Sequence, residues 1–418
     1  MRRICKTMLT SLRAFSRPAK LLLLAIFLDG LFFSGWNLFF NLYILAAGFD
    51  RQFLGLVNTA TALAGLLFGV PAGLLASRIG YRRAMIAGFA LSSLALIIQA
   101  LALHPAIIFI AGFLSGPFSQ LYVLSQAPFM MKVSDDKTRD LLFSLGFGLF
   151  PLASAAGNLL AGQGPALLNQ WLNLATDSAD VYRLLLLISI LLSLTAILPM
   201  LLIRLPQSSP AETSTEPGMR RAPASSLWRV LARPQTLRLA LPNLLIGFGA
   251  ALLVPYMNVF FAERYSLDER ALGLLFSLSS LLTGLACLVG PRLVGNLGGK
   301  VRVVLIGQTA SLFFLMLIGF SPTPWGSALG FLVRGALMNM VVPLFDAFAL
   351  EQTPESEHSA INSMRALAWS VGWAIGPYIS GVVQQQYGFT PLFISMAILY
   401  AIAILFTWVF FGRPSEHS

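Results

Sequence analysis

The feature that most constrains this chain is a succession of long apolar segments separated by short polar ones. A run of about 18 or more apolar residues can cross the hydrocarbon core of a bilayer as a helix. Hydrophobic residues make up 57% of the chain and charged residues only 11%, whereas soluble domains carry about 25% charged residues. We therefore predict an all-α membrane protein with twelve transmembrane helices. The expected spans are residues 21–46, 52–76, 84–103, 106–131, 141–168, 183–203, 236–262, 270–294, 301–320, 325–350, 359–386 and 391–411.

The basic residues predict how these spans are oriented. The net charge is +11, and cytoplasmic loops of membrane proteins carry an excess of Lys and Arg. Only Arg51, Arg183, Arg264 and Arg270 fall in the loops expected outside. Both termini are therefore expected in the cytoplasm, and the positive charge indicates membrane topology rather than a nucleic-acid partner. The basic segments expected in the cytoplasm are 1–20, 78–83, 132–139, 204–238 and 292–302.

The two halves of the chain repeat each other. Gly55 corresponds to Gly273 and Gly80 to Gly298, in each case 218 residues later. Three further pairs keep an offset of 218 or 219 residues: Asp50 with Asp268, Gly157 with Gly376, and Gly162 with Gly381. Such a parallel repeat of six spans is typical of transporters built from two related bundles.

This repeat defines the expected domain organisation. The polar segment between the halves is rich in Pro, Ser, Thr, Glu and Arg and has no apolar periodicity, so we expect a flexible linker there. The predicted parts are a cytoplasmic tail at 1–20, a six-helix bundle at 21–204, a linker at 205–234, a second six-helix bundle at 235–412 and a tail at 413–418.

A short basic turn joins the second and third expected spans. It reads Gly-Leu-Leu-Ala-Ser-Arg-Ile-Gly-Tyr-Arg-Arg over residues 73–83. Its spacing resembles the loop between helices 2 and 3 of the major facilitator superfamily, except that Ser77 stands at the usual acidic position. The positions that match are Gly73, Arg78, Gly80, Arg82 and Arg83.

The resemblance implies a secondary transporter whose two bundles rock around a central cavity. Spans 1, 4, 7 and 10 would line the cavity, and spans 2, 5, 8 and 11 would form the bundle interface. The turn at 73–83 would help to hold the inner side shut. Ser77 can offer only a neutral hydrogen bond, so the latch is expected to be weaker here.

Two signatures of the drug/proton antiporters of this superfamily are incomplete. The span 4 signature corresponds to residues 112–116, which lack its arginine, and the span 5 signature corresponds to residues 153–162, with Asn158 at its proline position. The better Gly-Pro match lies in span 11, at Gly376 and Pro377. Small residues in such patterns also have a structural interpretation, because they allow helices to approach closely.

Asp29 is the acidic residue deepest in the first half. It lies about nine residues into span 1, roughly 13 Å from the inner end at a rise of 1.5 Å per residue. A charge at the bilayer centre costs at least about 2.5–3.5 kcal/mol, so it needs a partner, water or a function. Asp29 is the candidate that takes up and releases the coupling proton, or contacts a cation. The alternative is a carboxylate that is hydrogen-bonded between helices for packing.

Span 10 and the start of span 11 carry the charges of the second half. Arg334 is expected in the outer half of span 10, where it could bind an anionic group of the substrate. Asp346 or Glu351 could pair with Arg365 as an inner gate; the alternative for Arg365 is a side chain that extends to the lipid headgroups. The gate candidates are Gly73, Ser77, Arg78, Gly80, Arg82, Asp346, Glu351 and Arg365.

Polar and aromatic side chains on the cavity-lining spans are the candidates for substrate contacts. Aromatic rings such as Trp36, Tyr122, Phe260, Trp369 and Trp373 suit an amphipathic substrate, and they equally suit helix packing. The cavity candidates are Trp36, Asn37, Asn41, Gln120, Tyr122, Gln126, Asn243, Tyr256, Asn258, Arg334 and Asn339.

The predicted function is proton-coupled export of a small amphipathic molecule by a monomeric, multi-pass protein of a bacterial inner membrane. Its expected partners are the substrate, protons and the lipid bilayer. The alternative is proton-coupled uptake of an anionic nutrient held by Arg334. A non-transporting receptor is disfavoured because no soluble domain is present. An enzyme is also disfavoured, because the three histidines lie at span ends or in the tail. Neither a cofactor nor a metal site is predicted, since no metal-ligand spacing occurs.

Overall fold

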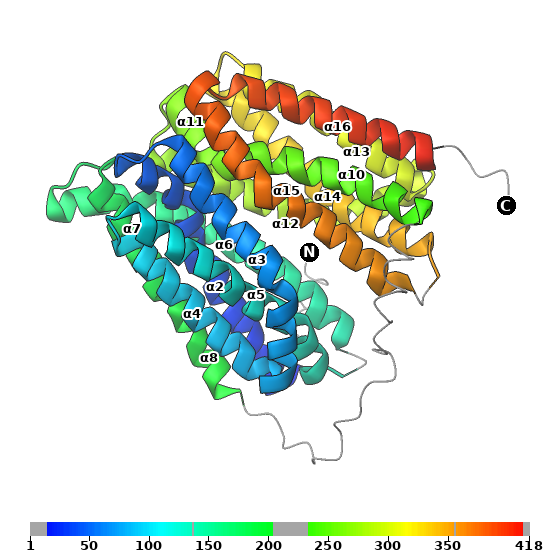
Figure 1. Ribbon diagram of the computed structural model, residues 1–418, viewed down its shortest axis with the longest axis horizontal. Coiled ribbons are helices and arrows are strands. Elements are labelled where there is room, and N and C mark those ends of the chain that lie inside the picture. Colours follow the sequence, from blue (N-terminus) through cyan, green and yellow to red (C-terminus); the bar gives the residue numbers. More distant parts are fainter. Residues whose placement is uncertain (1–14, 136–137, 204–232, 355–356, 413–418) are drawn as a thin grey trace, which may run out of the picture. The chain divides into compact units, whose positions relative to one another are not determined.

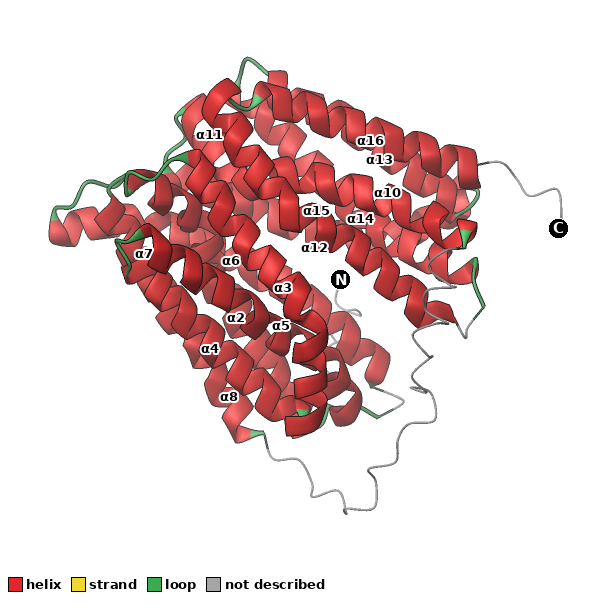
Figure 2. Cartoon of the chain, in the orientation of Figure 1, coloured by secondary structure: helices red, strands yellow, loops and turns green. Residues whose placement is uncertain are grey.

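The structure is a computed structural model that describes residues 15–135, 138–203, 233–354 and 357–412. The described residues form helices joined by short turns, with no strand among them (Figure 2). This confirms the predicted all-α fold. Most of the expected linker and N-terminal tail, and the expected C-terminal tail, lie outside the described residues.

The helices follow the expected spans closely. Eleven helices or helix groups among the described residues are long and apolar enough to cross a membrane. The remaining expected span, 270–294, forms α12, which is 29 residues long. The helices of the first half are α2 (Arg17–Ala46), α3 (Arg51–Ile79), α4 (Tyr81–Leu101), α5 (Pro105–Val133), α6 (Arg139–Leu172), α7 (Ala179–Ser193) and α8 (Ile197–Leu202). Those of the second half are α10 (Pro234–Leu253), α11 (Met257–Tyr265), α12 (Glu269–Leu297), α13 (Lys300–Phe320), α14 (Pro324–Glu351), α15 (His358–Tyr387) and α16 (Thr390–Phe411).

Two of the expected spans are interrupted by short 3₁₀ turns. The span expected at 236–262 is divided by η3 (Val254–Tyr256), with Pro255 inside the turn. A proline has no N–H to donate, and its ring clashes with the carbonyl group four residues earlier, so it favours a change of hydrogen bonding here, although Pro71 and Pro377 lie inside unbroken α-helices. The span expected at 183–203 is divided by η1 (Leu194–Ala196). Pro199 follows in α8 and leaves the carbonyl group of Thr195 without its usual helical donor.

The chain divides into two compact units, each described here by itself. Unit 1 comprises Met1–Gly48, Ala60–Pro210 and Glu269–Ser277. Within it α2 packs against α6 and α7, and α4 packs against α5 (Figure 1). Glycine permits the first of these contacts, because a Cβ atom on Gly30 would lie 2.7 Å from the Phe150 carbonyl oxygen. The core beside it is formed by Leu22, Ile26, Phe129 and other buried apolar side chains of α2, α4, α5 and α6.

Unit 2 comprises Phe49–Thr59, Ala211–Asp268 and Leu278–Ser418. Its packing mirrors that of unit 1: α10 lies between α15 and α16, and α13 packs against α14 (Figure 1). The contact of α10 with α15 again depends on a small residue, because a Cβ atom on Gly372 would lie 2.4 Å from the backbone nitrogen of Phe248.

Two short segments belong to the unit formed mostly by the other half of the chain. The start of α3 lies in unit 2, and the start of α12 lies in unit 1. Each is held by a pair of glycines, Gly55 with Gly381 in unit 2 and Gly273 with Gly162 in unit 1. A Cβ atom on Gly381 would lie 2.3 Å from the Arg51 carbonyl oxygen, and one on Gly162 would lie 2.7 Å from the Glu269 carbonyl oxygen. The glycines recognised in the sequence repeat therefore form equivalent close contacts in the two units.

Candidate functional site

The Asp29 carboxyl group lies in the interior of unit 1. Asp29 is 7% exposed, and Ser193 Oγ of α7 donates a hydrogen bond of 3.0 Å to its Oδ1 atom. Within the described part of the chain, Asp29 forms no ion pair and no cation acts on its carboxyl group. The α2 helix brings Asp29 to this place because neighbouring small residues, Gly30 and Ser34, let α2 approach α6 closely.

Tyr122 of α5 is the second hydroxyl beside Asp29. The Tyr122 side chain is buried, and its hydroxyl interacts electrostatically with the Asp29 carboxyl group and lies near Gln126. In the described structure this hydroxyl nevertheless makes no hydrogen bond of good geometry. A buried hydroxyl without a partner is costly, so the oxygen of Tyr122 is a group that a hydrogen bond from a water molecule, a solute or a protonated carboxyl group could satisfy.

The other cavity candidates of the first half are dispersed. Trp36 is buried and stacks on Phe40 with 5.0 Å between the ring centroids, whereas Asn37 is exposed. Asn41 is buried. Gln120 lies against α3, where its Nε2 atom would be 3.3 Å from a Cβ atom on Gly65. The structure therefore brings Tyr122 to Asp29, with Gln126 beside Tyr122.

Arg334 of α14 is buried in unit 2 beside a phenol. Its Nη2 atom donates a hydrogen bond of 3.1 Å to the Tyr400 hydroxyl, and the guanidinium carbon lies 5.4 Å from the centroid of the Tyr400 ring. The residue is 8% exposed, and its Nε atom has no hydrogen-bond partner in the described structure. No ion pair joins Arg334 to a carboxylate of the described residues. The site therefore contains a positive charge stabilised by neutral groups.

The remaining candidates of the second half are engaged in contacts within unit 2. Asn243 donates a hydrogen bond of 2.8 Å to the Arg365 carbonyl oxygen, and the Tyr256 hydroxyl donates one of 2.9 Å to the Pro377 carbonyl oxygen. The Asn258 side chain accepts from the Val259 backbone. Asn339 is exposed and donates to the Gly335 carbonyl oxygen over 2.9 Å. The contacts of Asn243 and Tyr256 join α10 and η3 to α15, whereas those of Asn258 and Asn339 lie within their own helices.

Arg365 forms one of the two ion pairs considered from the sequence. Its Nη2 atom lies 2.5 Å from Asp346 Oδ1, and its guanidinium lies 5.1 Å from the centroid of the Phe345 ring. Glu351 pairs with Lys300 instead. The Arg365 side chain is only 6% exposed, whereas the Asp346 side chain is 50% exposed, so the arginine is buried and its partner lies at the surface of unit 2.

The basic turn at 73–83 contributes contacts within unit 1. Arg82 donates hydrogen bonds to the carbonyl oxygens of Met200 and Leu201, over 3.1 and 2.8 Å, and so satisfies groups left free at the end of α8. Ser77 donates to the Leu74 carbonyl oxygen of its own helix. Gly80 has a φ of +88°, a conformation that glycine adopts readily and that ends α3 at Ile79. Gly73 borders Leu124 of α5, and Arg78 lies in the last turn of α3.

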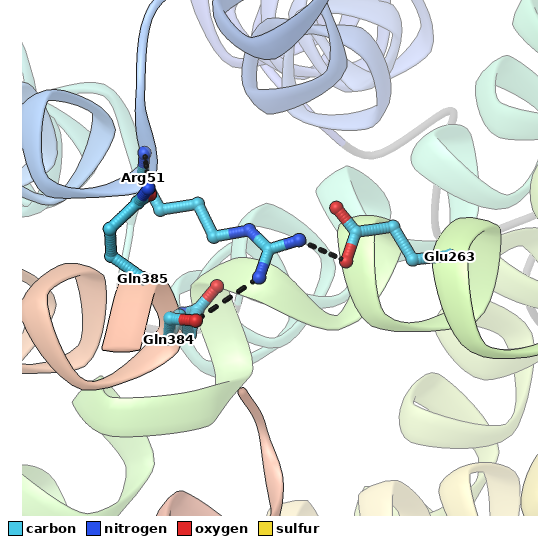
Figure 3. Close-up of polar contacts among 4 residues, drawn as sticks. All are labelled: Arg51, Glu263, Gln384 and Gln385. Carbon is cyan, nitrogen blue, oxygen red and sulfur yellow. Dashed lines mark hydrogen bonds and ion pairs between the residues drawn. The ribbon is translucent and has the colours of Figure 1, made fainter. Parts of the chain in front are cut away.

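A cluster around Arg51, which we call the Arg51 clamp, holds the start of α3 in unit 2. It consists of Arg51, Glu263, Gln384 and Gln385 (Figure 3). Arg51 Nη2 lies 2.7 Å from Glu263 Oε2, and Arg51 Nη1 donates to the Gln384 carbonyl oxygen over 3.1 Å. The Arg51 backbone nitrogen donates to Gln385 Oε1, also over 3.1 Å. A single side chain and its backbone thus connect α3 to α11 and α15.

Unit 1 contains the counterpart of the Arg51 clamp. Position 269 corresponds to position 51 in the repeat, and Glu269 Oε1 accepts a hydrogen bond of 2.6 Å from the Tyr182 hydroxyl. Sequence reasoning counted Arg51 only as a loop charge and did not single out Glu269. The available signal was their place in the repeat, directly after Asp50 and Asp268 and four residues before the paired glycines.

Ser193 and Tyr400 are the other residues that sequence reasoning missed. Each supplies the hydroxyl that a buried charge needs, yet single hydroxyl residues in apolar spans are common and carry no distinctive pattern. In the described part of the chain, no three His, Cys, Asp or Glu side chains gather as they would around a metal ion.

Comparison with known proteins identifies the family. Residues 22–349 and 239–418 match the Major Facilitator Superfamily. The MFS-type transporter YhhS of Escherichia coli strain K12 is 27% identical over 189 residues, which are 45% of this chain and 45% of that protein. The aligned stretch is therefore less than half of that relative. The chromaffin granule amine transporter of Rattus norvegicus is 25% identical over 370 residues, covering 84% of this chain and 64% of that protein.

The fold agrees with this match. The crystal structure of the nucleoside transporter NupG is similar with a TM-score of 0.71 at 16% identity, over 95% of this chain and 99% of that chain. At this identity the likeness shows the fold alone. Together with the family match over both halves of the sequence, it leads to one conclusion: this chain belongs to the Major Facilitator Superfamily.

Proposed function

We propose that this chain is a secondary transporter that exports a small amphipathic solute across a bacterial cytoplasmic membrane in exchange for protons. The observation that carries the proposal is the Asp29 carboxyl group, which is buried, accepts one hydrogen bond from Ser193 and has no cation beside it among the described residues. A buried charge without a counter-ion is costly, and residues of this kind inside a membrane span are functional candidates by default.

The surroundings of Asp29 suit both protonation states. When the carboxyl group is ionised, the hydroxyls of Ser193 and Tyr122 can both donate to it. When it is protonated, its own O–H can donate to the oxygen of Tyr122, which has no partner of good geometry in the described structure. A group that is satisfied in either state can take up a proton on one side of the membrane and release it on the other.

The Arg51 clamp supports the conformational part of the proposal. A carrier that alternates access needs helix contacts that can be released in one of its states. The Arg51–Glu263 pair suits this requirement because its side chains are 28% and 38% exposed, and partly exposed pairs contribute only about 0–1 kcal/mol. The paired glycines beside it allow close backbone contact without interlocking side chains that would hinder separation.

A lipophilic amine is the substrate class that fits this site best. A protonated amine bound near Asp29 would be favoured while the carboxyl group is ionised and disfavoured once it is protonated, and this difference couples the exit of one to the entry of the other. The similarity to the chromaffin granule amine transporter over 84% of the chain supports an amine. Aromatic residues near the site, Tyr122 and Phe89 with 5.1 Å between their ring centroids, could contact its apolar part.

The test is transport by purified protein in vesicles with an imposed pH gradient, with ethidium as the fluorescent cationic probe. We expect Asp29→Asn to abolish gradient-driven transport while probe exchange at equal pH continues, because exchange requires only movement of the loaded carrier. Asp180→Asn is the matched control, since Asp180 is an exposed carboxylate paired with Arg183.

Other outcomes would redirect the proposal. If Asp29→Asn impaired exchange and gradient-driven transport together and lowered thermal stability, Asp29 would be a packing carboxylate. If the variant concentrated the probe as well as the parent protein, coupling would have to occur elsewhere, and Asp346 would be the next residue to replace.

A second candidate function is proton-coupled uptake of an anionic nutrient, and Arg334 is the observation that favours it. Its buried guanidinium has a phenol but no carboxylate among the described residues, and its Nε atom has no partner there. A ligand that binds only the folded protein at 100 times its Kd stabilises it by about 2.7 kcal/mol. Thermal-shift screens with small organic anions and small organic amines, each on parent and Arg334→Lys protein, distinguish the two candidates. Stabilisation by anions that Arg334→Lys abolishes would favour uptake.

A further inference from the structure

An apolar groove runs along the outside of α10 in unit 2. Its volume is about 450 Å³, and it is lined by residues of the first turns of α10, of α15 and of the end of α16. Apolar side chains from all three helices form its walls, among them Leu241, Leu244, Leu367 and Phe410. Arg238, in the second turn of α10, is the one charged residue among those that line it. The groove is therefore lined by apolar side chains and has the Arg238 guanidinium near one end.

The position of the groove relative to a membrane follows from its helices. The spans that include α10, α15 and α16 are all long and apolar enough to cross a bilayer. Leu237 and Leu367 in its walls are 50% and 47% exposed, so they lie on the outer surface of the unit. Arg238 is four residues after Pro234, about 6 Å along the helix at 1.5 Å per residue. In a bilayer spanned by α10, this depth would place the guanidinium near the lipid headgroups and the apolar walls beside the acyl chains.

Arg238 differs in its charge balance from other cations at this end of unit 2. Arg233 pairs with Glu357, Lys300 pairs with Glu351, and Arg365 pairs with Asp346. No ion pair joins Arg238 to a carboxylate of the described residues; its guanidinium instead lies 5.6 Å from the centroid of the Phe410 ring. That contact orients the positive charge over the apolar groove without neutralising it.

We propose that this groove binds one anionic phospholipid. The phosphate group would lie against Arg238, and one acyl chain would lie in the groove between α15 and α16. Basic pockets between transmembrane helices on the cytoplasmic side are suited to anionic headgroups. The expected topology places this end of α10 in the cytoplasmic leaflet. The proposal depends on that orientation and is independent of the substrate and the coupling ion.

The test is lipid binding measured by native mass spectrometry of the full chain in detergent, titrated with phosphatidylglycerol and, separately, phosphatidylcholine. We expect the parent protein to prefer phosphatidylglycerol about fivefold, as one added basic contact provides. Arg238→Gln should remove this preference and leave phosphatidylcholine binding unchanged. Arg302→Gln is the matched control, because Arg302 is another exposed arginine at the same end of unit 2 that lies outside the groove.

A second variant tests the acyl-chain part of the groove. Leu367→Trp adds volume at a partly exposed position of its wall, so it should reduce binding of both lipids while the melting temperature remains close to that of the parent. Equal loss of preference in Arg238→Gln and Arg302→Gln would overturn the proposal, because the effect would then be one of general surface charge. Undiminished preference in Arg238→Gln would overturn it as well, as would lipid binding unaffected by Leu367→Trp.

The orientation is checked separately with a single cysteine at Ser415. Labelling of this cysteine in intact cells only by membrane-permeant reagents would agree with the expected topology. Labelling by an impermeant reagent would place the groove in the outer leaflet and would contradict its assignment to the cytoplasmic leaflet.

Discussion

Among the described residues, the interior of each unit contains an ionisable side chain with neutral partners, and the two carry opposite charges when ionised. In unit 1 the Asp29 carboxyl group accepts a hydrogen bond from Ser193. In unit 2 the Arg334 guanidinium donates to Tyr400 and lies over its ring. A carboxyl group can be neutralised by one proton, whereas a guanidinium stays protonated under all physiological conditions. The charge of Asp29 can therefore change by protonation, whereas the charge of Arg334 is permanent.

This difference separates the roles that the two residues can take. A proton carrier must change its charge during the cycle, and of the two only Asp29 can do so. A fixed positive charge can instead hold an anionic group or keep neighbouring helices in place. We therefore expect replacements at Asp29 to affect coupling most, and replacements at Arg334 to affect stability and ligand binding most.

The largest effect on stability is expected for Arg334→Ala. This change leaves a cavity and a buried Tyr400 hydroxyl without its partner, so we expect a loss of at least about 3 kcal/mol in the free energy of unfolding. Asp29→Asn keeps the size of the side chain and should cost less than about 1 kcal/mol. Thermal unfolding in the same detergent measures both. A larger loss for Asp29→Asn than for Arg334→Ala would contradict the contrast between them.

The glycine pairs allow a second comparison between the units. Gly381→Ala would bring a Cβ atom to 2.3 Å from the Arg51 carbonyl oxygen in unit 2, and Gly162→Ala would bring one to 2.7 Å from the Glu269 carbonyl oxygen in unit 1. Overpacking of this kind costs about 1–3 kcal/mol. We expect both variants to unfold at lower temperature, Gly381→Ala the more strongly. A stabilising effect of either substitution would mean that the backbones separate easily.

Removing the hydroxyl beside each charge compares the charges directly. Hydrogen bonds to an ionised group are about twice as strong as neutral ones. If Asp29 is protonated in the resting protein while Arg334 is charged, Tyr400→Phe should cost about 1.5–3 kcal/mol and Ser193→Ala about 0.5–1.5 kcal/mol. Chemical denaturation of the two variants at neutral pH gives the ratio. Equal costs would indicate that the Asp29 carboxyl group is ionised as well.

The smallest effect on stability is expected for the Arg51 clamp. Its ion pair is partly exposed, so Arg51→Gln should lower the free energy of unfolding by about 0.5 kcal/mol or less. The consequence for conformation should be easier to detect, because the clamp connects α3 to α11 and α15. A single cysteine at Gln52 should react faster with an impermeant maleimide in Arg51→Gln protein than in parent protein. The same rate in both would show that the paired glycines hold the contact without the clamp.

Comparing the expected and observed spans shows which features of the helices can be predicted from local sequence patterns. Apolar runs predicted the extent of most helices to within a few residues, because a span must satisfy every backbone group within itself. They did not predict the breaks at η1 and η3, because hydropathy identifies a span without specifying where its helical hydrogen bonding changes. Proline does not mark such breaks by itself, since Pro71 and Pro377 lie inside unbroken α-helices. The repeat of Gly55 and Gly273 predicted equivalent positions, and the structure adds the glycine that each one meets.

The candidate site was predicted only in part. The sequence alone singled out Asp29, Tyr122, Arg334, Asp346 and Arg365, because polar groups in an apolar span are rare and need a reason. It did not predict that Tyr122 lies beside Asp29, nor that Ser193 and Tyr400 would serve the two charges. Asp346 and Arg365 are near enough in sequence for their pairing to be considered, whereas Arg51 and Gln384 are 333 residues apart.

The sequence by itself therefore determined that the chain is a membrane protein, that its halves repeat each other and which family it resembles. Hydropathy, glycine spacing and the basic turn are local properties that can be read along the chain. Only the tertiary structure decided which charges remain without a counter-ion. The partners of Asp29, Arg334 and Arg365 come from other helices, whose rotation and depth are set by close packing of small residues. For this reason Asp346 and Arg365 neutralise each other, while Asp29 and Arg334 are left with hydroxyl groups.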